Sequence, residues 1–513
     1  MKSIYNKILV LIILLILSLQ TEAQKAFTIS LIETTLNNLS NLKGVLKYPK
    51  EVRELYLNNQ YQSFWIHAND RKSLLVLLDI IGHAEENGLK QEDYQPDLYK
   101  RYIKNEKFIN NNTDSLVDEV KLSDAAIHFL HDIESGNLED LVSYNGLNYS
   151  PACNNLAKVL RSYINSGRLP LMAQEMGPKG EEFITLRNKL NFMRIMVAQP
   201  NFKDSIITSK EISISNLPLI SRFTQLGFNE TELKNNIKKA ALLFDTYDNG
   251  KLSSQLLNAL NVPIKNRITA IERAINTMRW LNCIKKENHV IVVNIPSANL
   301  KLYERGKMIL ESNIIVGKKT TPTPTLSSKI TDVVIYPYWH VPNRIATHEL
   351  LPSIKRNPTY LEANNFQLLD KKGKVMDASS INWKDVSANN FPYEIRQSTG
   401  CDNSLGLVKL NFYNPFSVYL HDTPVKGLFN SHKRYFSHGC MRLQKAVELA
   451  HYILKGNTRV MDSLIAKGCL KMQAPITIPA SEIIPVFVLY NTAWINGSFD
   501  VIFYDDIYGK YIH

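Results

Sequence analysis

The chain has 513 residues, of which 44% are hydrophobic and 21% charged, and this composition excludes an intrinsically disordered protein. Its length predicts two to four domains. A formal net charge of +12 favours anionic surroundings, although a solvated surface with a basic bias is the simpler explanation, and no segment resembles a nucleic-acid-binding module.

The N-terminus has the pattern of a secretory signal. Lys2 and Lys7 precede an apolar run over residues 8–19, and the small-residue segment 21–23 offers a cleavage site. We therefore predict a signal peptide over residues 1–23 and export of the mature chain. An uncleaved leader extending from Tyr5 is the alternative, and it would hold the protein at the membrane.

Residues 24–205 show helical periodicity. Leu74, Leu77 and Ile81 recur at helical spacing ahead of a break at Asn87-Gly88, and residues 125–133 form a second amphipathic pattern. Residues 206–282 predict short helices around the turn at Asn249-Gly250. A small binding module and a three-helix spacer fit this second segment equally well.

The pattern changes to a period of two after residue 288. Alternating apolar residues flank a turn at 304–307 and predict β-hairpins, and a last hairpin turns at Asn496-Gly497. Between residues 341 and 396 the chain returns to a mixed polar and helical character. The C-terminal half is therefore predicted to be mainly β with a different segment inserted.

One short segment has the features of a nucleophilic site. Cys440 follows a glycine and a histidine, and another histidine, His421, lies 19 residues upstream. A thiol attacks a carbonyl carbon as the thiolate, so it needs a nearby base, a cation or a helix N-terminus. The spacing leaves room for a loop that brings the two segments together, and we interpret Cys440 as a nucleophile with a histidine partner.

The residues after Cys440 predict a helix. Apolar residues recur at helical spacing, with Gly456 as a stop, at Leu443, Ala446, Val447, Ala450, Ile453 and Leu454. Cys440 is then expected just ahead of a helix N-terminus, whose dipole favours negative charge. The backbone N–H groups of Gly439 and Cys440 are expected to face a developing oxyanion.

Two histidines compete for the role of base. If residues 438–440 are extended, His438 and Cys440 point to the same face, which favours His438. A zinc site would combine His421, His432, His438 and Cys440, but their spacings match no compact ligand pattern, so we predict no metal. The residues alone leave the choice between His421 and His438 open.

A family resemblance bears on that choice. The motif Ser437-His438-Gly439-Cys440-Met441-Arg442 resembles the signature of the L,D-transpeptidases, the YkuD-type cysteine enzymes of bacterial peptidoglycan. Residues 419–424 resemble the partner motif that carries their catalytic histidine. Further segments are similar to the long, periplasmic YcbB-like branch: 292–296, 300–303, 315–324, 336–342, 402–406, 492–494 and 506–509, with Trp65, 86–89 and 93–94 in its scaffold domain.

The resemblance implies an α+β multidomain fold. Its parts would be a helical scaffold domain (24–205), a small helical peptidoglycan-binding-like module (206–282) and a mainly β YkuD-type catalytic domain (284–510) with a capping subdomain at about 341–396. It also implies a periplasmic location, peptidoglycan stem peptides as substrate, other cell-wall synthesis proteins as partners, and no cofactor.

The resemblance further implies a reaction. The thiol would attack the carbonyl of the third residue of a tetrapeptide stem and release the terminal D-alanine. An amine of a neighbouring stem would then resolve the thioester and form a 3-3 crosslink, whereas water would give L,D-carboxypeptidase activity.

Roles for individual residues follow from the same resemblance. In this family the upstream histidine is the base, which moves the assignment from His438 to His421. Tyr419 would orient this histidine or the oxyanion, and Arg442 would hold a stem carboxylate, with packing as the alternative for both. Ser437, His438 and Gly439 would line the oxyanion or substrate site.

Two rival functions remain at this point. In a non-catalytic wall-binding protein the fold would persist with an idle site, but Cys440, His421, Gly439 and Arg442 are all present. In a papain-like protease the cysteine precedes the histidine, and here the order is reversed.

The five cysteines are Cys153, Cys283, Cys401, Cys440 and Cys469. An odd number leaves a thiol unpaired in an oxidising compartment, and Cys440 is expected to be that thiol. Cys401 stands where the family branch has a proline or another small residue. It is expected either to be a small buried replacement or to pair with Cys440 and block it, provided that their Cα atoms lie within about 7 Å.

Overall fold

The computed structural model describes residues 29–37, 46–66, 71–103, 112–137, 141–150, 153–229, 231–247, 249–287, 289–357, 359–468, 470–471 and 473–511. The predicted signal peptide lies outside these ranges. The chain divides into one compact unit of Met1–Glu139, Pro151–Phe202 and Ile268–Cys283, and a second of Asp140–Ser150, Lys203–Arg267 and Ile284–His513. None of the described helices has the length and apolar character required to cross a membrane.

The first unit is helical. Its helices are α2 (Pro49–Leu57), α3 (Lys72–Gly82), α4 (Pro96–Ile103), α5 (Asn112–Ser135), α6 (Leu156–Asn165), α7 (Met172–Met176) and α8 (Glu181–Val197). Helices α3 and α5 confirm the two sequence patterns, and α5 is buried along most of its length because the other helices pack around it. A disulfide joins Cys153 to Cys283 at the end of α13 (Ile264–Glu287).

Short helices begin the second unit. They are α9 (Ser209–Ile214), α10 (Leu217–Gln225), α11 (Leu233–Leu243) and α12 (Ser254–Leu260). Helix α9 starts at a reciprocal capping box between Thr208 and Glu211. The guanidinium of Arg267 lies 4.7 Å from the ring centroid of Phe244 and 5.0 Å from that of Phe503, which ties this helical segment to the C-terminal strands.

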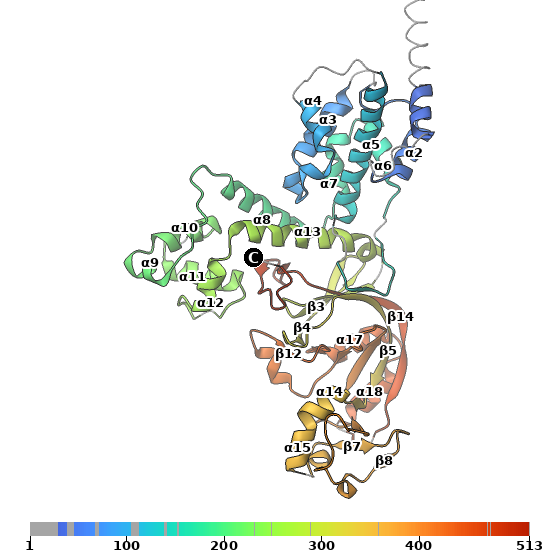
Figure 1. The fold of residues 1–513 in the computed structure, drawn as a ribbon, viewed down its shortest axis with the longest axis vertical. Coiled ribbons are helices and arrows are strands. Elements are labelled where there is room, and N and C mark those ends of the chain that lie inside the picture. The colour runs from blue at the N-terminus through green and yellow to red at the C-terminus, as the bar shows by residue number, and fades with distance from the viewer. Residues whose placement is uncertain are drawn as a thin grey trace, which may run out of the picture. The chain divides into compact units, whose positions relative to one another are not determined.

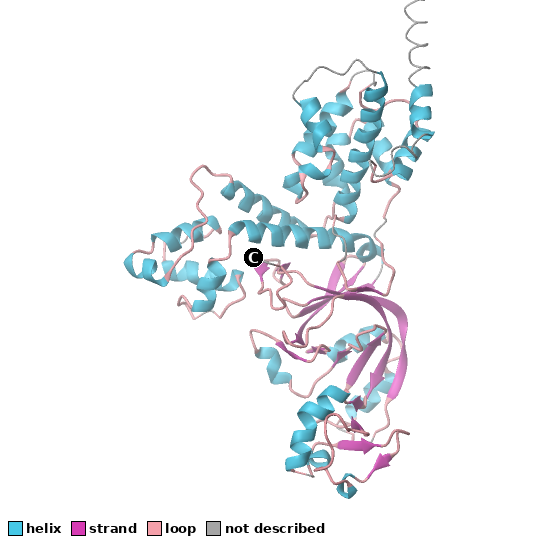
Figure 2. Ribbon diagram, in the orientation of Figure 1, coloured by secondary structure: helices cyan, strands magenta, loops and turns pink. Residues whose placement is uncertain are grey.

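The rest of the second unit is built on a mixed sheet, whose long curved strands are visible in Figure 1 and Figure 2. Its strands are β1 (Tyr144–Asn145), β2 (His289–Asn294), β3 (Asn299–Glu304), β4 (Lys307–Gly317), β5 (Leu326–Ile335), β10 (Val408–Phe412), β11 (Leu420–His421), β12 (Tyr435–Ser437), β13 (Met441–Leu443) and β14 (Ile476–Leu489). The order is β1-β5-β10-β11-β13-β4-β3-β2-β14, and β12 pairs with β4. Because β14 also pairs with β5, the pairing closes on itself around an apolar core to which α17 (Ala446–Ile453) and α18 (Arg459–Ala466) contribute.

The predicted hairpins are present. Strands β3 and β4 are joined through Arg305 and Gly306, both with positive φ. The last hairpin, β15 (Ala493–Ile495) and β16 (Val501–Phe503), turns at the predicted Asn496-Gly497 but through five residues, with positive φ at Phe499 instead of the glycine. The chain is therefore α+β, helical first and mainly β afterwards, as predicted.

The inserted segment contains a sheet as well as helices. It forms a four-stranded sheet, in the order β6 (Trp339–His340), β9 (Glu394–Gln397), β7 (Phe366–Leu369) and β8 (Val375–Met376), together with α14 (Asn343–Ile345), a π-helix at Ala346–Leu350, α15 (Leu351–Arg356) and α16 (Tyr360–Ala363). These elements share a hydrophobic cluster of their own, which includes Ile354 and Leu368. We refer to residues 339–397 as the cap.

Candidate active site

Three neighbouring strands assemble the candidate site. Strand β11 runs parallel to β13, with His421 opposite Arg442, and antiparallel to β10, with His421 opposite Lys409. Side chains alternate between the two faces of a strand. Since Leu410, Leu420 and Met441 are fully buried in the core, residues 409, 421 and 442 must lie on the other face. Tyr419 and Cys440 continue the same alternation by two residues.

That face opens into a cavity of about 620 Å³. All the predicted site residues except Gly439 line it, and the cap adds a second group of side chains. The lining comprises Lys318, Thr320, Thr321, Trp339, Pro342, Arg344, Ile345, His348, Glu349, Ser404, Leu405, Phe416, Ser417, Val418, Tyr419, His421, Ser437, His438, Cys440 and Arg442. This size is in the range of small-molecule sites.

The cysteine loop is shaped by Ser437. Its Oγ donates a hydrogen bond to the carbonyl of Cys440 (2.6 Å) and accepts one from the N–H of Gly439 (3.1 Å). The expectation that the Gly439 N–H faces an oxyanion is therefore wrong for this conformation. The expected helix N-terminus is also wrong, because strand β13 follows Cys440 directly and α17 begins only at Ala446.

The Thr- and Pro-rich loop at residues 320–325 also contacts the cysteine loop, residues 437–440. Thr323 donates its Oγ1 hydrogen to the carbonyl of Gly439 (2.8 Å), and Thr321 donates to the carbonyl of Ser437 (3.2 Å). Gly439 has a φ of 115°, a conformation that favours glycine. The loop is thus held by carbonyl contacts, and a side chain at 439 would strain it.

The thiol of Cys440 is half-buried, and burial raises its pKa. Four groups oppose this shift: the N–H and the hydroxyl of Tyr419, which hydrogen-bond to the sulfur, and the charges of Lys409 and Arg442. Burial likewise raises the pKa of Tyr419. The tyrosine hydroxyl therefore remains protonated at neutral pH and can donate to the thiolate.

His421 is buried and neutral. Burial, followed by the charge of Arg442, lowers its pKa to about 3. Its Nδ1 lies 2.5 Å from the carbonyl of Asp422. Because a carbonyl only accepts, Nδ1 must carry the hydrogen, which leaves Nε2 with a free lone pair for a proton.

His438 has a different environment. Its Nε2 lies 2.7 Å from the Glu349 carboxylate of the cap. The same-face argument for His438 also fails, because residues 438–440 form a bend instead of an extended strand. Of the alternative zinc ligands, His432 does not line the cavity and contacts Asp245 at 3.5 Å, and the described residues hold no group of three or more side chains placed to bind one metal ion.

Two cations lie beside the thiol and form no salt bridge within the described ranges, although the charge of Asp332 also acts on Lys409. Lys409 Nζ lies 4.2 Å from the ring centroid of Tyr419. Neither Lys409 nor Arg442 forms an ion pair with a carboxylate in the part of the chain that the structure describes. Their charges are therefore available to the Cys440 thiolate or to an anionic ligand.

The cysteines correct one expectation. Cys440 is the free cysteine within the described ranges, as predicted. Cys401 is exposed and is itself disulfide-bonded, so it neither is a small buried replacement nor pairs with Cys440. Redox blocking of the nucleophile by Cys401 is excluded in this structure.

Sequence reasoning missed the contributions of Lys409 and of the cap residues Arg344 and Glu349. Lys409 had a detectable signal, since it alternates with the apolar residues Val408 and Leu410 and is therefore expected on the face of a strand that points away from the core. Arg344 and Glu349 had none, because Arg344 lies on the three-residue helix α14 and Glu349 on the π-helix that follows it, and no simple periodicity encodes either element.

Comparison with known proteins gives a consistent result. Residues 288–461 match the YkuD family, described as an L,D-transpeptidase catalytic domain, and residues 50–190 match a scaffold domain family. A Haemophilus influenzae protein described as "Putative L,D-transpeptidase" is 40% identical over 238 residues, which are 46% of this chain and 47% of that protein. The chain thus matches about half of the length of this relative.

Solved structures were compared as well. An L,D-transpeptidase from Mycobacterium smegmatis is 13% identical, with a TM-score of 0.19, over 39% of this chain and 58% of that one. An LD transpeptidase in complex with imipenem gives the same values of 13%, 0.19, 39% and 58%. Scores this low carry no structural argument.

Proposed function

The chain belongs to the L,D-transpeptidases, with a YkuD catalytic domain and an N-terminal scaffold domain, and from this premise we propose that Cys440 and His421 catalyse acyl transfer between peptidoglycan stem peptides. The observation that carries the proposal is the pairing of strands β11 and β13, which places the free thiol and a neutral imidazole on one face of the sheet, in one cavity.

The proposed acylation begins with proton transfer. The thiol proton passes to Nε2 of His421 while the sulfur attacks the carbonyl carbon of the third residue of a tetrapeptide stem. The carbon–nitrogen bond to the terminal D-alanine breaks, and the amine leaves with the proton from His421. The product of this half-reaction is a thioester on Cys440.

The second half-reaction reverses these roles. An amine of a neighbouring stem attacks the thioester, His421 takes its proton, and the thiol is regenerated as a 3-3 crosslink forms. Tyr419 and the two unpaired cations Lys409 and Arg442 stabilise the thiolate in each half-reaction. Arg442 and Arg344 also line the cavity where stem carboxylates would bind.

The site would act outside the cytoplasm, where peptidoglycan lies. We propose a periplasmic enzyme that uses the signal over residues 1–23, with peptidoglycan stems as its substrate and other cell-wall synthesis proteins as partners. The segment 206–282 is proposed as a peptidoglycan-binding-like module.

The test uses purified full-length protein and tetrapeptide stems, with products identified by mass spectrometry. Loss of D-alanine together with a 3-3 dimer supports the transpeptidase. Loss of D-alanine with a free tripeptide alone would identify an L,D-carboxypeptidase, and no turnover together with retained wall binding would identify a non-catalytic wall-binding protein.

A further inference from the structure

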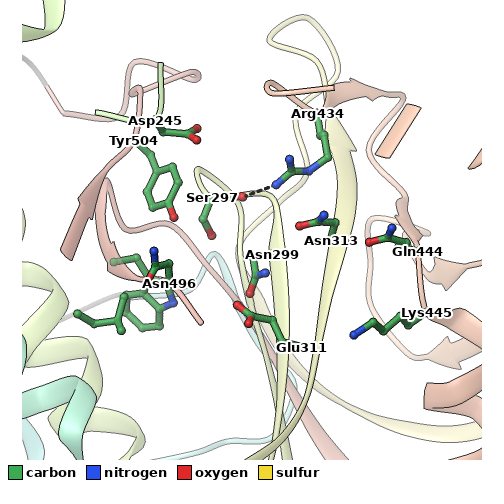
Figure 3. Close-up of a pocket in the computed structure, with 12 residues that line it drawn as sticks. Asp245, Ser297, Asn299, Glu311, Asn313, Arg434, Gln444, Lys445, Asn496 and Tyr504 are labelled. Atoms are coloured by element: carbon green, nitrogen blue, oxygen red, sulfur yellow. Dashed lines mark hydrogen bonds between the residues drawn. The ribbon is translucent and has the colours of Figure 1, made fainter. Parts of the chain in front are cut away.

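A second, strongly polar pocket lies beside the C-terminal hairpin (Figure 3). It has a volume of about 330 Å³ and is distinct from the cavity at Cys440, with which it shares no residue. Its lining consists of Asp245, Ser297, Asn299, Glu311, Asn313, Arg434, Gln444, Lys445, Trp494, Ile495, Asn496 and Tyr504. The volume is at the lower end of the range of roughly 300–1,000 Å³ that is usual for small-molecule sites.

The pocket is built on the outer face of strands β3 and β4. Asn299 pairs in register with Asn313, and Glu311 lies two residues from Asn313 on the same face. Buried Lys301 donates to the carbonyl of Ile495 (2.9 Å), which fixes the hairpin over this face. The floor of the pocket is therefore a rigid, hydrogen-bonded sheet.

Most of the pocket's polar side chains have unused hydrogen-bonding capacity. The side chains of Asn299, Glu311, Asn313, Gln444 and Lys445 make no hydrogen bond or ion pair with the rest of the described chain, and Figure 3 shows the first three beside one another. Asn299, Glu311 and Asn313 are half-buried, and Gln444 and Lys445 are exposed at the rim, so all five are open to solvent. A set of unpaired carboxamides and charges facing one cavity is thus suited to an external ligand.

The charges of the lining select the ligand class. Asp245 and Glu311 are balanced by Arg434 and Lys445. Two of these four charges are already engaged, since Asp245 contacts Lys433 at 3.3 Å and Arg434 donates to the carbonyl of Ser297 at 3.1 Å. A balanced, amide-rich pocket fits an uncharged ligand with many hydroxyl and amide groups better than it fits a phosphate or a carboxylate.

Aromatic rings complete the lining. Trp494 is only 3% exposed, whereas Tyr504 is half-buried and offers an aromatic surface next to its polar hydroxyl. Carboxamides, opposed charges and this aromatic surface together match a pyranose ring, whose hydroxyl groups point outward and whose C–H groups form apolar faces.

The pocket also lies within reach of the nucleophile. Gln444 and Lys445 follow β13 directly, and the N–H of Gln444 bonds to the carbonyl of Asn313, so strand alternation places Cys440, Arg442 and Gln444 on the same face. Five extended residues from Cys440 to Lys445 span at most about 17 Å, and a three-residue stem spans about 10 Å. When a stem peptide is bound at the thiol, the sugar that carries it therefore lies at a distance comparable to that between Cys440 and the pocket.

We propose that this pocket is a saccharide subsite that binds an N-acetylated amino sugar of the peptidoglycan glycan. The choice of peptidoglycan as the source rests on the proposed function, whereas the class of ligand rests on the pocket itself. The subsite would hold the glycan while the stem enters the cavity at Cys440.

The test measures binding of a tetramer of N-acetylglucosamine to the full-length protein by calorimetry. We expect binding by the wild type, weakened about tenfold or more in Asn299→Ala and in Asn313→Ala. The matched control is Asn411→Ala, which removes a half-buried strand asparagine outside the pocket that is bonded to Asp332. The melting temperature of each variant is measured to show that it is folded.

A wild-type protein that does not bind the tetramer, or pocket variants that bind as tightly as the control, would overturn the saccharide subsite. Binding of a sugar-free stem that the same substitutions weaken would overturn it in favour of a peptide site. Acyl transfer from a sugar-free stem is measured in parallel and should be unchanged in the pocket variants. Its absence from the wild type would reject the proposed function without affecting the binding result.

Discussion

The helical unit and the candidate active site use buried ionisable groups in opposite ways. In the helical unit, fully buried Glu119 accepts hydrogen bonds from the N–H groups of Phe64 and Ile66 (2.7 Å each) and from the hydroxyl of Tyr56 (3.0 Å). At the site, Lys409 and Arg442 form no salt bridge with a carboxylate of the described residues, and the Cys440 thiolate acts on the charge of both. A saturated polar network fixes a fold, whereas an unsaturated one keeps charge available for a reacting group.

Removal of the proposed nucleophile tests the candidate active site most directly. We expect Cys440→Ala to abolish covalent labelling by a carbapenem while leaving the melting temperature near that of the wild type, because the thiol is the proposed covalent catalyst. Intact-protein mass spectrometry measures the adduct. An adduct that persists in this variant would place the nucleophile elsewhere.

Replacement of the two histidines gives the next largest effect. We expect His421→Ala to slow adduct formation about 10²–10⁴-fold, the usual contribution of a general base. His438→Ala is the matched variant and should have a much smaller effect, because His438 is engaged with Glu349 of the cap. Stopped-flow acylation rates compare the two, and a larger loss in His438→Ala would reverse the assignment.

Much of this site follows from sequence, because its residues alternate on strands. The order Tyr419, His421 and the order Cys440, Arg442 place two pairs of side chains on one face as soon as the two segments are paired. The helix expected just after Cys440 begins later, at Ala446, because Leu443 fits the helical spacing of the residues that follow it although it ends strand β13.

Other features depend on contacts that no local pattern specifies. The bond from the Gly439 N–H to Ser437 follows from the fold of the loop, and the disulfide state of Cys401 follows from tertiary proximity. The cap could be located as an interruption of the β pattern, but its own sheet depends on pairing between segments more than twenty residues apart.

Disruption of the hydrogen-bond network around Glu119 should lower the stability of the fold without slowing the reaction at Cys440. Glu119→Ala leaves the three buried N–H groups of residues 64–66 and a tyrosine hydroxyl without this acceptor, at about 1–3 kcal/mol each, so the free energy of unfolding should fall by about 3 kcal/mol or more. Thermal denaturation measures the effect. Carbapenem labelling of the folded variant should keep the wild-type rate, and a slower rate at full folding would show that this network also serves the site.

The smallest expected effect concerns the charge beside the thiol. In the wild type, the acylation rate should rise on the alkaline side as Cys440 ionises, since burial raises its pKa, and it should show no inflection near pH 6.5, since His421 is already neutral above about pH 3. Lys409→Met removes a positive charge that favours the thiolate, so the thiol pKa should rise further.

The rate–pH profile of carbapenem labelling therefore shifts to higher pH in Lys409→Met, and Lys409→Arg restores it, because arginine keeps the charge. Lys329→Met, an exposed lysine on β5, is the matched control and should leave the profile unchanged. A lysine that merely packs on Tyr419 would lower the melting temperature without moving the alkaline midpoint. An unmoved midpoint in Lys409→Met would thus reduce Lys409 to a structural residue and leave Arg442 as the cation that serves the thiolate.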